Sequence, residues 1–233
     1  MSALLPREPR PTIEITPLPG GRSGAGIEVR PGEILILTGG QGGAAAALLE
    51  AAVGRRTSVA VQATIGGLSL GDLSPRTRRK AARSLRLCYI ASEPALISNL
   101  TIMENLLLPI RYVGGRDEAE AAQEALERLG AAGLQDAARW LPARLTPSER
   151  KSVALIRGLL PRPLAAVMHE PVSGLEGASL ESGKEQIRAA LGEGGCAILA
   201  AAHDPAPYED LGARTVNLGD LLHHEAFESR SLS

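Results

Sequence analysis

The sequence predicts an α/β fold in which a mostly parallel β-sheet is flanked by helices. Short aliphatic runs recur along the 233 residues, and most are separated by segments with helical periodicity. This alternation is typical of a parallel sheet that is buried on both faces. The apolar content of 44% comes mainly from Ala, Leu, Val and Ile, which predicts an aliphatic core. A chain of this length suits one compact domain, which we expect to cover residues 1–233.

Strand patterns lie on both sides of a helical stretch. Residues 12–16 and 26–29 alternate apolar and polar positions and predict edge strands. The aliphatic runs predict buried strands at Ile34–Leu37, Leu87–Ile90, Ala165–Met168, Ala197–Ala201 and Thr215–Leu218. Between residues 96 and 141 the strand pattern is absent, and residues 118–129 place apolar side chains on one helix face. With a break at Gly114-Gly115, this stretch predicts an inserted helical subdomain.

Charge and aromatic content argue against nucleic acid as a partner. The 25 basic and 26 acidic residues leave a net charge of −1, so no global field draws the chain to nucleic acid or to an anionic membrane. One Trp, three Tyr and one Phe supply no platform on which bases could stack. The exception is a basic run at residues 76–80, followed by Arg83 and Arg86. It is interpreted either as a solvated helix face or as a contact for phosphates or lipid headgroups.

The cysteines and the apolar runs indicate where the protein works. Cys88 and Cys196 lie in apolar runs without metal-type spacing, which predicts buried thiols in a reducing compartment. No apolar stretch is long enough to span a bilayer, and the first residues lack a continuous signal-peptide core. We therefore expect a cytoplasmic chain without direct membrane insertion, which reaches a membrane only through a partner.

A Gly-rich turn between an expected strand and helix has the layout of a phosphate-binding loop. In the P-loop motif G-x-x-x-x-G-K-[ST], glycines allow close backbone approach, the lysine reaches the terminal phosphates and the hydroxyl binds magnesium. Residues 32–54 keep this layout, but the second glycine is Ala44, and alanines replace the lysine and the hydroxyl. The positions expected to face the cofactor are Gly39, Gly42, Gly43, Ala45 and Ala46.

Two later segments are similar to motifs of the ABC transporter ATPases. Residues 87–110 look like the Q-loop region, in which a strand leads to a glutamine, and Ser92 stands at the glutamine position. Residues 145–160 resemble the signature helix, which usually opens Leu-Ser-Gly-Gly-Gln. Here it opens LTPSE, so Thr146 and Ser148 mark the signature position.

Two more segments resemble the motifs that complete such an ATPase. Residues 163–176 are similar to the Walker B strand and the D-loop, but His169 replaces the aspartate that serves the metal. Glu170 follows at the position of the family's general base. Residues 197–205 look like the H-loop, in which His203, at the position of the switch histidine, comes after a buried strand.

Five motifs in the family's order identify the chain as a degenerate member of the ABC transporter ATP-binding (nucleotide-binding domain) family, over about residues 32–218. The resemblance implies a P-loop NTPase-like fold with N-terminal antiparallel strands and a helical subdomain at about residues 96–160. It also implies an integral-membrane permease as partner, with a groove for it at residues 96–110, although those apolar side chains are equally explained by a buried core. The resemblance further implies that the chain pairs as a homodimer, or as a heterodimer with another ABC ATPase subunit. It also implies a peripheral location on the inner face of the cell membrane.

The substitutions predict weak nucleotide binding. Loss of the lysine removes a charge-assisted phosphate contact of about 1.5–3 kcal/mol. Ala46 and His169 also remove the groups that anchor magnesium, and a combined loss of about 3–6 kcal/mol weakens binding by about two to four powers of ten. No cofactor is therefore expected at this site, apart from weak ATP and magnesium binding that needs a partner. The helix start after Gly42 and Gly43 retains some attraction for an anion.

The signature segment also predicts a helix that caps itself. Thr146 at the N-cap, Pro147 at the first helical position and Glu149 at the third form a capping box. In the family this helix start faces the γ-phosphate held by the opposite subunit. Here the capping groups would occupy those amides and the carboxylate would repel the anion, while Ser148 leaves a residual contact open.

Glu170 and His203 are the candidate catalytic residues, both interpreted as vestigial. One hypothesis gives each of them hydrogen bonds at the end of the sheet. The other keeps them for a site rescued by a partner. His169 has no companion ligands at metal spacing, so no metal site is expected. His223 and His224 are expected to be exposed.

Three functional hypotheses follow. The first is a pseudo-ATPase subunit that docks on a permease as a structural or regulatory module. The second is the degenerate half of an asymmetric heterodimer, in which a paralogue supplies the working ATP site. The third is a soluble α/β binding protein unrelated to transport. The number of altered motifs indicates natural divergence, because a laboratory knock-out usually alters one residue.

Overall fold

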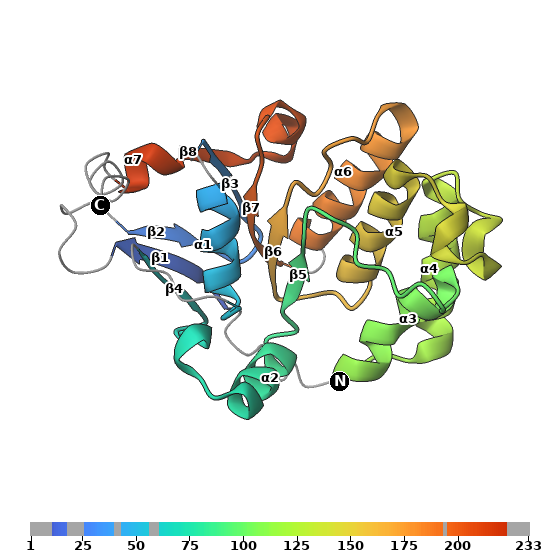
Figure 1. Ribbon diagram of the computed structural model, residues 1–233, viewed down its shortest axis with the longest axis horizontal. Coiled ribbons are helices and arrows are strands. Elements are labelled where there is room, and N and C mark those ends of the chain that lie inside the picture. The colour runs from blue at the N-terminus through green and yellow to red at the C-terminus, as the bar shows by residue number, and fades with distance from the viewer. Residues whose placement is uncertain (1–10, 18–25, 40–42, 56–60, 193–194, 223–233) are drawn as a thin grey trace, which may run out of the picture.

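The computed structural model describes residues 11–17, 26–39, 43–55, 61–192 and 195–222. Its centre is a five-stranded parallel sheet in the order β5-β6-β7-β3-β8 (Figure 1). The strands are β3 (Ile34–Thr38), β5 (Cys88–Ile90), β6 (Ala165–His169), β7 (Ala197–Ala201) and β8 (Arg214–Asn217). The predicted parallel α/β class is confirmed. The prediction of a buried last strand was wrong, because β8 is an edge strand whose side chains are mostly exposed.

A second sheet is antiparallel and has the order β2-β1-β4. Its strands are β1 (Ile13–Pro17), β2 (Ile27–Val29) and β4 (Val61–Ile65). Ile13 and Ile15 are fully buried while Glu14 between them is exposed, so one face of β1 packs on the core. The antiparallel N-terminal strands were expected, whereas β4 was not predicted.

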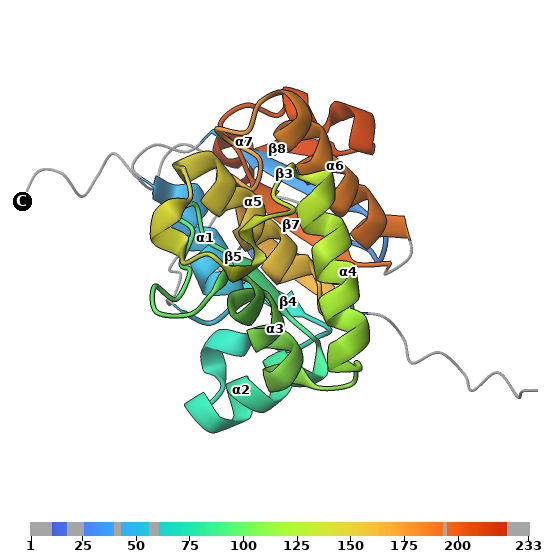
Figure 2. The ribbon, with the colours of Figure 1, turned by 90° about the vertical axis from the view of Figure 1, so that its right-hand side faces the viewer.

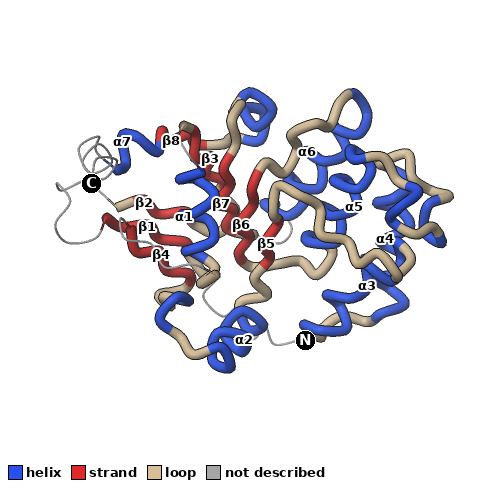
Figure 3. The backbone as a smooth tube through the Cα atoms, in the orientation of Figure 1, coloured by secondary structure: helices blue, strands red, loops and turns tan. Residues whose placement is uncertain are grey.

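Helices cover both faces of the parallel sheet, as Figure 3 shows. α1 (Ala44–Ala52) packs against both sheets on one side, and α5 (Pro147–Leu159) and α6 (Gly177–Gly192) pack on the other. Alternate residues of β3 serve the two cores: Leu35 contacts the α1 side and Ile36 the α5–α6 side. The α/β part of the molecule also contains η2 (Leu70–Asp72), α2 (Pro75–Ser84), η5 (Ala206–Leu211) and α7 (Leu218–Leu222).

The helical region predicted from the sequence lies beside the β5 end of the sheet and faces the viewer in Figure 2. It contains α3 (Ile102–Val113), α4 (Glu118–Ala131), η3 (Ala137–Arg139) and η4 (Pro142–Arg144). Leu106, Leu129 and Ile156 are fully buried in its own hydrophobic cluster, to which α5 also contributes. No helix within the described ranges is long and apolar enough to cross a bilayer.

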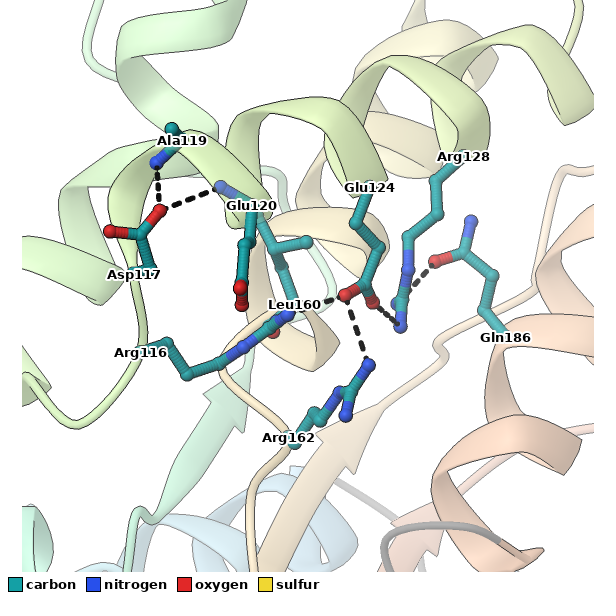
Figure 4. A network of polar contacts seen from close by, with 9 residues as sticks. All are labelled: Arg116, Asp117, Ala119, Glu120, Glu124, Arg128, Leu160, Arg162 and Gln186. Carbon is teal, nitrogen blue, oxygen red and sulfur yellow. Dashed lines mark hydrogen bonds and ion pairs between the residues drawn. The ribbon is translucent and has the colours of Figure 1, made fainter.

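A cluster of charges joins this helical region to the rest of the molecule (Figure 4). Glu124 on α4 forms ion pairs with Arg116 at 2.6 Å, Arg128 at 2.6 Å and Arg162 at 3.2 Å. Arg128 also donates a hydrogen bond to Gln186 on α6 at 3.2 Å. Arg116 donates one to the backbone carbonyl of Leu160, the C-cap residue of α5, at 2.6 Å. Burial alone raises the pKa of Glu124, but the hydrogen bond from Arg116 and the three cationic charges outweigh it and lower that pKa.

Candidate functional site

The structure describes the two ends of the turn between β3 and α1, and both ends are glycines with a left-handed backbone. Gly39 has φ 70°, and a Cβ there would lie 3.0 Å from the side-chain amide of Asn217. Gly43 is the N-cap of α1 with φ 81° and makes no side-chain capping bond. Ala45 and Ala46 follow in the first helical turn and are half-buried. Gly42 lies outside the described residues.

The ends of β6 and β7 lie side by side, and Glu170 links them. Its backbone amide donates a hydrogen bond to the carbonyl of Ala201 at 2.8 Å. Its carboxylate accepts one from the backbone amide of His203 at 2.7 Å. Glu170 has a left-handed φ of 51°, which is unfavourable for a residue with a side chain. The carboxylate is thus held by main chain, in keeping with the hypothesis that Glu170 makes hydrogen bonds at the sheet end.

Lys151 is a site neighbour that sequence reasoning missed. From the second turn of α5 its ammonium donates a hydrogen bond to the backbone carbonyl of Glu170 at 2.9 Å. Burial lowers the pKa of Lys151, and the charges of Glu170 and Glu93 oppose that shift. No local pattern marked this residue, because the contact joins positions 19 residues apart.

The start of α5 is capped as predicted. The hydroxyl of Thr146 accepts from the amide of Glu149 at 3.2 Å, and the carboxylate of Glu149 accepts from the amide of Thr146 at 2.7 Å. α3 begins with the same arrangement of Thr101 and Glu104. Ser148 is half-buried in the first turn of α5. Among the described residues, no hydrogen bond or ion pair connects this turn with the carboxyl ends of β3, β6 and β7.

The Q-loop position lies beside a small cavity. Ser92 is half-buried two residues beyond β5, and the cavity next to it has about 110 Å³ and is lined by Tyr89, Pro94 and Arg157 among others. Arg157 closes one side by donating a hydrogen bond to the carbonyl of Ala95 at 2.8 Å. A larger cavity of about 340 Å³ lies at the opposite edge of the sheet, around Glu33.

The carboxyl edge of the parallel sheet therefore gathers part of the predicted site. The pairing of β6 with β7, and of β7 with β3, places His169, Glu170, His203 and Gly39 at the same edge. The side chain of His203 is exposed, and that of His169 is half-buried. In the part of the chain that the structure describes, no group of His, Cys, Asp and Glu could hold a metal ion.

Solved structures share this fold. A post-hydrolysis dimer of the ATP-binding cassette MJ0796 with ADP and phosphate matches with a TM-score of 0.75 at 18% identity, covering 91% of this chain and 97% of that one. The ATP-binding subunit of an ABC transporter matches with a TM-score of 0.73 at 24% identity, covering 90% and 86%. The fold is thus that of an ATP-binding cassette, although no protein-family model matches the chain.

Curated relatives extend the likeness to sequence. One from Granulibacter bethesdensis is 32% identical over 181 residues, which are 78% of each chain. One from Paramagnetospirillum magneticum is 29% identical over 191 residues, which are 82% of each chain. The chain belongs to the family of ABC-type ATP-binding proteins. Both relatives bear the name lipoprotein-releasing system ATP-binding protein LolD.

Proposed function

We propose that this chain is a catalytically silent subunit of an ABC transporter, docked on a membrane permease as a structural or regulatory module. The observation that carries the proposal is the pair Ala45 and Ala46, whose methyl groups stand where the resemblance places the phosphate-binding lysine and the magnesium-binding hydroxyl. Gly39 and Gly43, which precede this pair, both have a left-handed backbone, and glycine is the residue that adopts this conformation most readily. These observations support a turn of the phosphate-loop kind that lacks the side chains with which such a loop holds a nucleotide.

The rest of the donor set does not fit a magnesium nucleotide either. The Walker B aspartate position is His169, an imidazole that offers no carboxylate oxygen to a hard cation. One carboxylate oxygen of Glu170 accepts a hydrogen bond from the backbone amide of His203, which supports a structural role for this side chain at the sheet end. At the signature helix, Thr146 and Glu149 satisfy the amides that would otherwise meet a phosphate.

Several features support the setting of this subunit. The cassette fold and the LolD relatives support a permease partner, pairing with a second cassette, and a place on the inner face of the membrane. The second cassette is either a copy of this chain or a paralogue. The name of the relatives, a lipoprotein-releasing system, supports a lipid-modified cargo for the transporter. The permease would be the subunit that contacts this cargo.

A titration with a fluorescent ATP analogue and magnesium tests the proposal directly. The wild-type chain is expected to remain unbound up to millimolar nucleotide. The matched control is the repaired chain A44G/A45K/A46T/H169D, which is expected to bind about two to four powers of ten more tightly. Micromolar binding by the wild-type chain would contradict the proposal.

The assembled complex, copurified with its partners, gives the second measurement. Phosphate release by the complex is expected to be unchanged by Glu170→Gln in this chain, because any hydrolysis comes from a paralogous subunit. Release that persists in this way identifies the asymmetric pair, whereas no release at all identifies a scaffold. Release that disappears with Glu170→Gln would show that Glu170 is a working general base and would overturn the proposal.

A further inference from the structure

One helix concentrates the positive charge of the chain. Between residues 76 and 86 there are six basic residues and no acidic one, and α2 carries most of them. The remaining 19 basic and 26 acidic residues leave the rest of the chain with a net charge of −7. A strongly basic segment on an otherwise acidic chain is a local electrostatic feature that the proposed function does not explain.

The two faces of α2 have different roles. Arg78 points inward and donates hydrogen bonds to the carbonyls of Gly54 and, at 3.0 Å, of Leu73, which anchors the helix to the core. Arg76, Arg79 and Lys80 point outward, are exposed, and have no ion-pair partner among the described residues. Their charge is therefore available to a partner.

The end of α3 adds an aromatic group to this surface. Arg83 donates a hydrogen bond to the carbonyl of Val113 at 3.2 Å and lies over the ring of Tyr112, 5.5 Å from its centre. Tyr112 is 56% exposed, and Leu108 one turn earlier is 38% exposed. Figures 1 and 2 both show α2 at one edge of the molecule with α3 next to it. We name the surface formed by Arg76, Arg79, Lys80, Arg83 and Tyr112 the basic edge.

We propose that the basic edge contacts the anionic headgroups of the bilayer beside the permease. This rests on the proposed function, because a subunit docked on a permease is held close to a membrane. Arg76, Arg79 and Lys80 have no ion-pair partner among the described residues, and such long basic side chains suit a diffuse layer of negative charge better than one acidic protein surface of fixed geometry. An exposed tyrosine beside an exposed leucine suits the headgroup level, where amphipathic rings are enriched. Nucleic acid is disfavoured because the chain has only five aromatic residues and so offers no platform on which bases could stack.

The test is cosedimentation of the full chain with phosphatidylcholine vesicles, with and without phosphatidylglycerol, at low and high salt. Binding is expected only with phosphatidylglycerol, and it should weaken with salt because exposed charges are screened. Each basic residue near such a surface contributes about a five-fold increase in partitioning, so R76Q/R79Q/K80Q is expected to bind about a hundred-fold more weakly. The control R139Q/R144Q/R188Q removes the same charge from other exposed sites and is expected to bind like the wild type.

Other outcomes decide against the proposal. Equal binding to both kinds of vesicle, no binding to either, or an equal loss in the two triple variants would overturn it. Binding to a soluble acidic peptide or a DNA duplex but not to vesicles would assign the basic edge to a different partner and would overturn it as well. Because no nucleotide is present, these results do not depend on whether the chain binds ATP, so failure here is separable from failure of the pseudo-ATPase proposal.

Discussion

Replacing Glu124 by glutamine is expected to destabilise the protein, because three arginines lose the carboxylate that they share. The side chains of Glu124, Arg116 and Arg128 are 20%, 14% and 18% exposed, so these charges are largely removed from water. Removing one member of a buried ion pair costs about 3–5 kcal/mol. Solvent screening at the rim, where Arg162 is 51% exposed, reduces the expected loss in free energy of unfolding to about 2–3 kcal/mol.

Thermal unfolding and urea denaturation at neutral pH measure this loss, which corresponds to a midpoint about 4–12 °C lower for a domain of this size. Glu118→Gln on the same helix is the matched control. Its partner is Arg111, and the two side chains are 48% and 50% exposed, so its midpoint is expected to stay close to that of the wild type. Equal midpoints for the two variants would refute a stabilising role for the Glu124 cluster.

The difference in free energy of unfolding between the wild type and Glu124→Gln is expected to depend on pH. The folded-state pKa of Glu124 lies below the ordinary value of 4.5, because burial, which raises it, is outweighed by Arg116 and the other arginines. A carboxylate with a lowered pKa stabilises the folded state above the unfolded value and loses that contribution as the pH falls through the folded value. The gap between wild type and Glu124→Gln should therefore narrow in acid below pH 4.5. A gap that widens there would contradict this assignment.

Three further predictions concern single side chains. Thr146→Ala is expected to lower the free energy of unfolding by about 1 kcal/mol, as is Thr101→Ala at the matching cap of α3, and an unchanged urea midpoint would mean that the hydroxyl cap is dispensable. Burial raises the pKa of Cys88 to about 12 and also raises the pKa of Cys196, so a thiol reagent such as Ellman's should label neither until the chain unfolds. Prompt labelling of the native protein would show that these thiols are accessible. Glu170→Ala is expected to cost about 1.5–3 kcal/mol through loss of a charge-assisted hydrogen bond, with part of it recovered in the glutamine variant, and denaturation curves that coincide with the wild type would exclude this role.

Most of the fold was predictable because its information is local. Aliphatic runs of four or five residues between helical segments predicted the strands of the parallel sheet. The observed five-stranded sheet confirms the α/β class. β4 escaped prediction because one of its buried residues is Ala63, whose short methyl group gives little contrast with Gln62 and Thr64 on either side. β8 shows the reverse error: the segment Thr215–Leu218 was grouped with the buried runs, although β8 itself contains a single apolar residue, Val216, and lies at an exposed sheet edge.

In the candidate site, too, contacts between residues close in sequence were predictable and contacts between distant residues were not. The capping box at Thr146 was predictable, because its partners are three residues apart and helix geometry fixes their distance. The contact between Glu170 and the amide of His203 joins residues 33 positions apart and depends on the unusual φ of Glu170. The backbone amide of Glu170 is also bonded to the carbonyl of Ala201, and no local sequence pattern encodes either contact. Lys151 was missed for the same reason.

The first turn of α1 connects helix stability with the choice of residue at the phosphate-binding positions. The helix is held by Leu48 and Leu49, which are buried between the two sheets, and no ligand is needed to keep it in place. Alanine is also the best helix former, and returning a hydroxyl such as threonine at Ala46 costs about 0.5 kcal/mol of helix propensity. Under the proposed function, alanine at these positions therefore favours folding of the helix, whereas the threonine of the repaired chain lowers helix propensity there. In the proposed subunit the same alanines thus stabilise α1 and remove the contacts that a nucleotide would need.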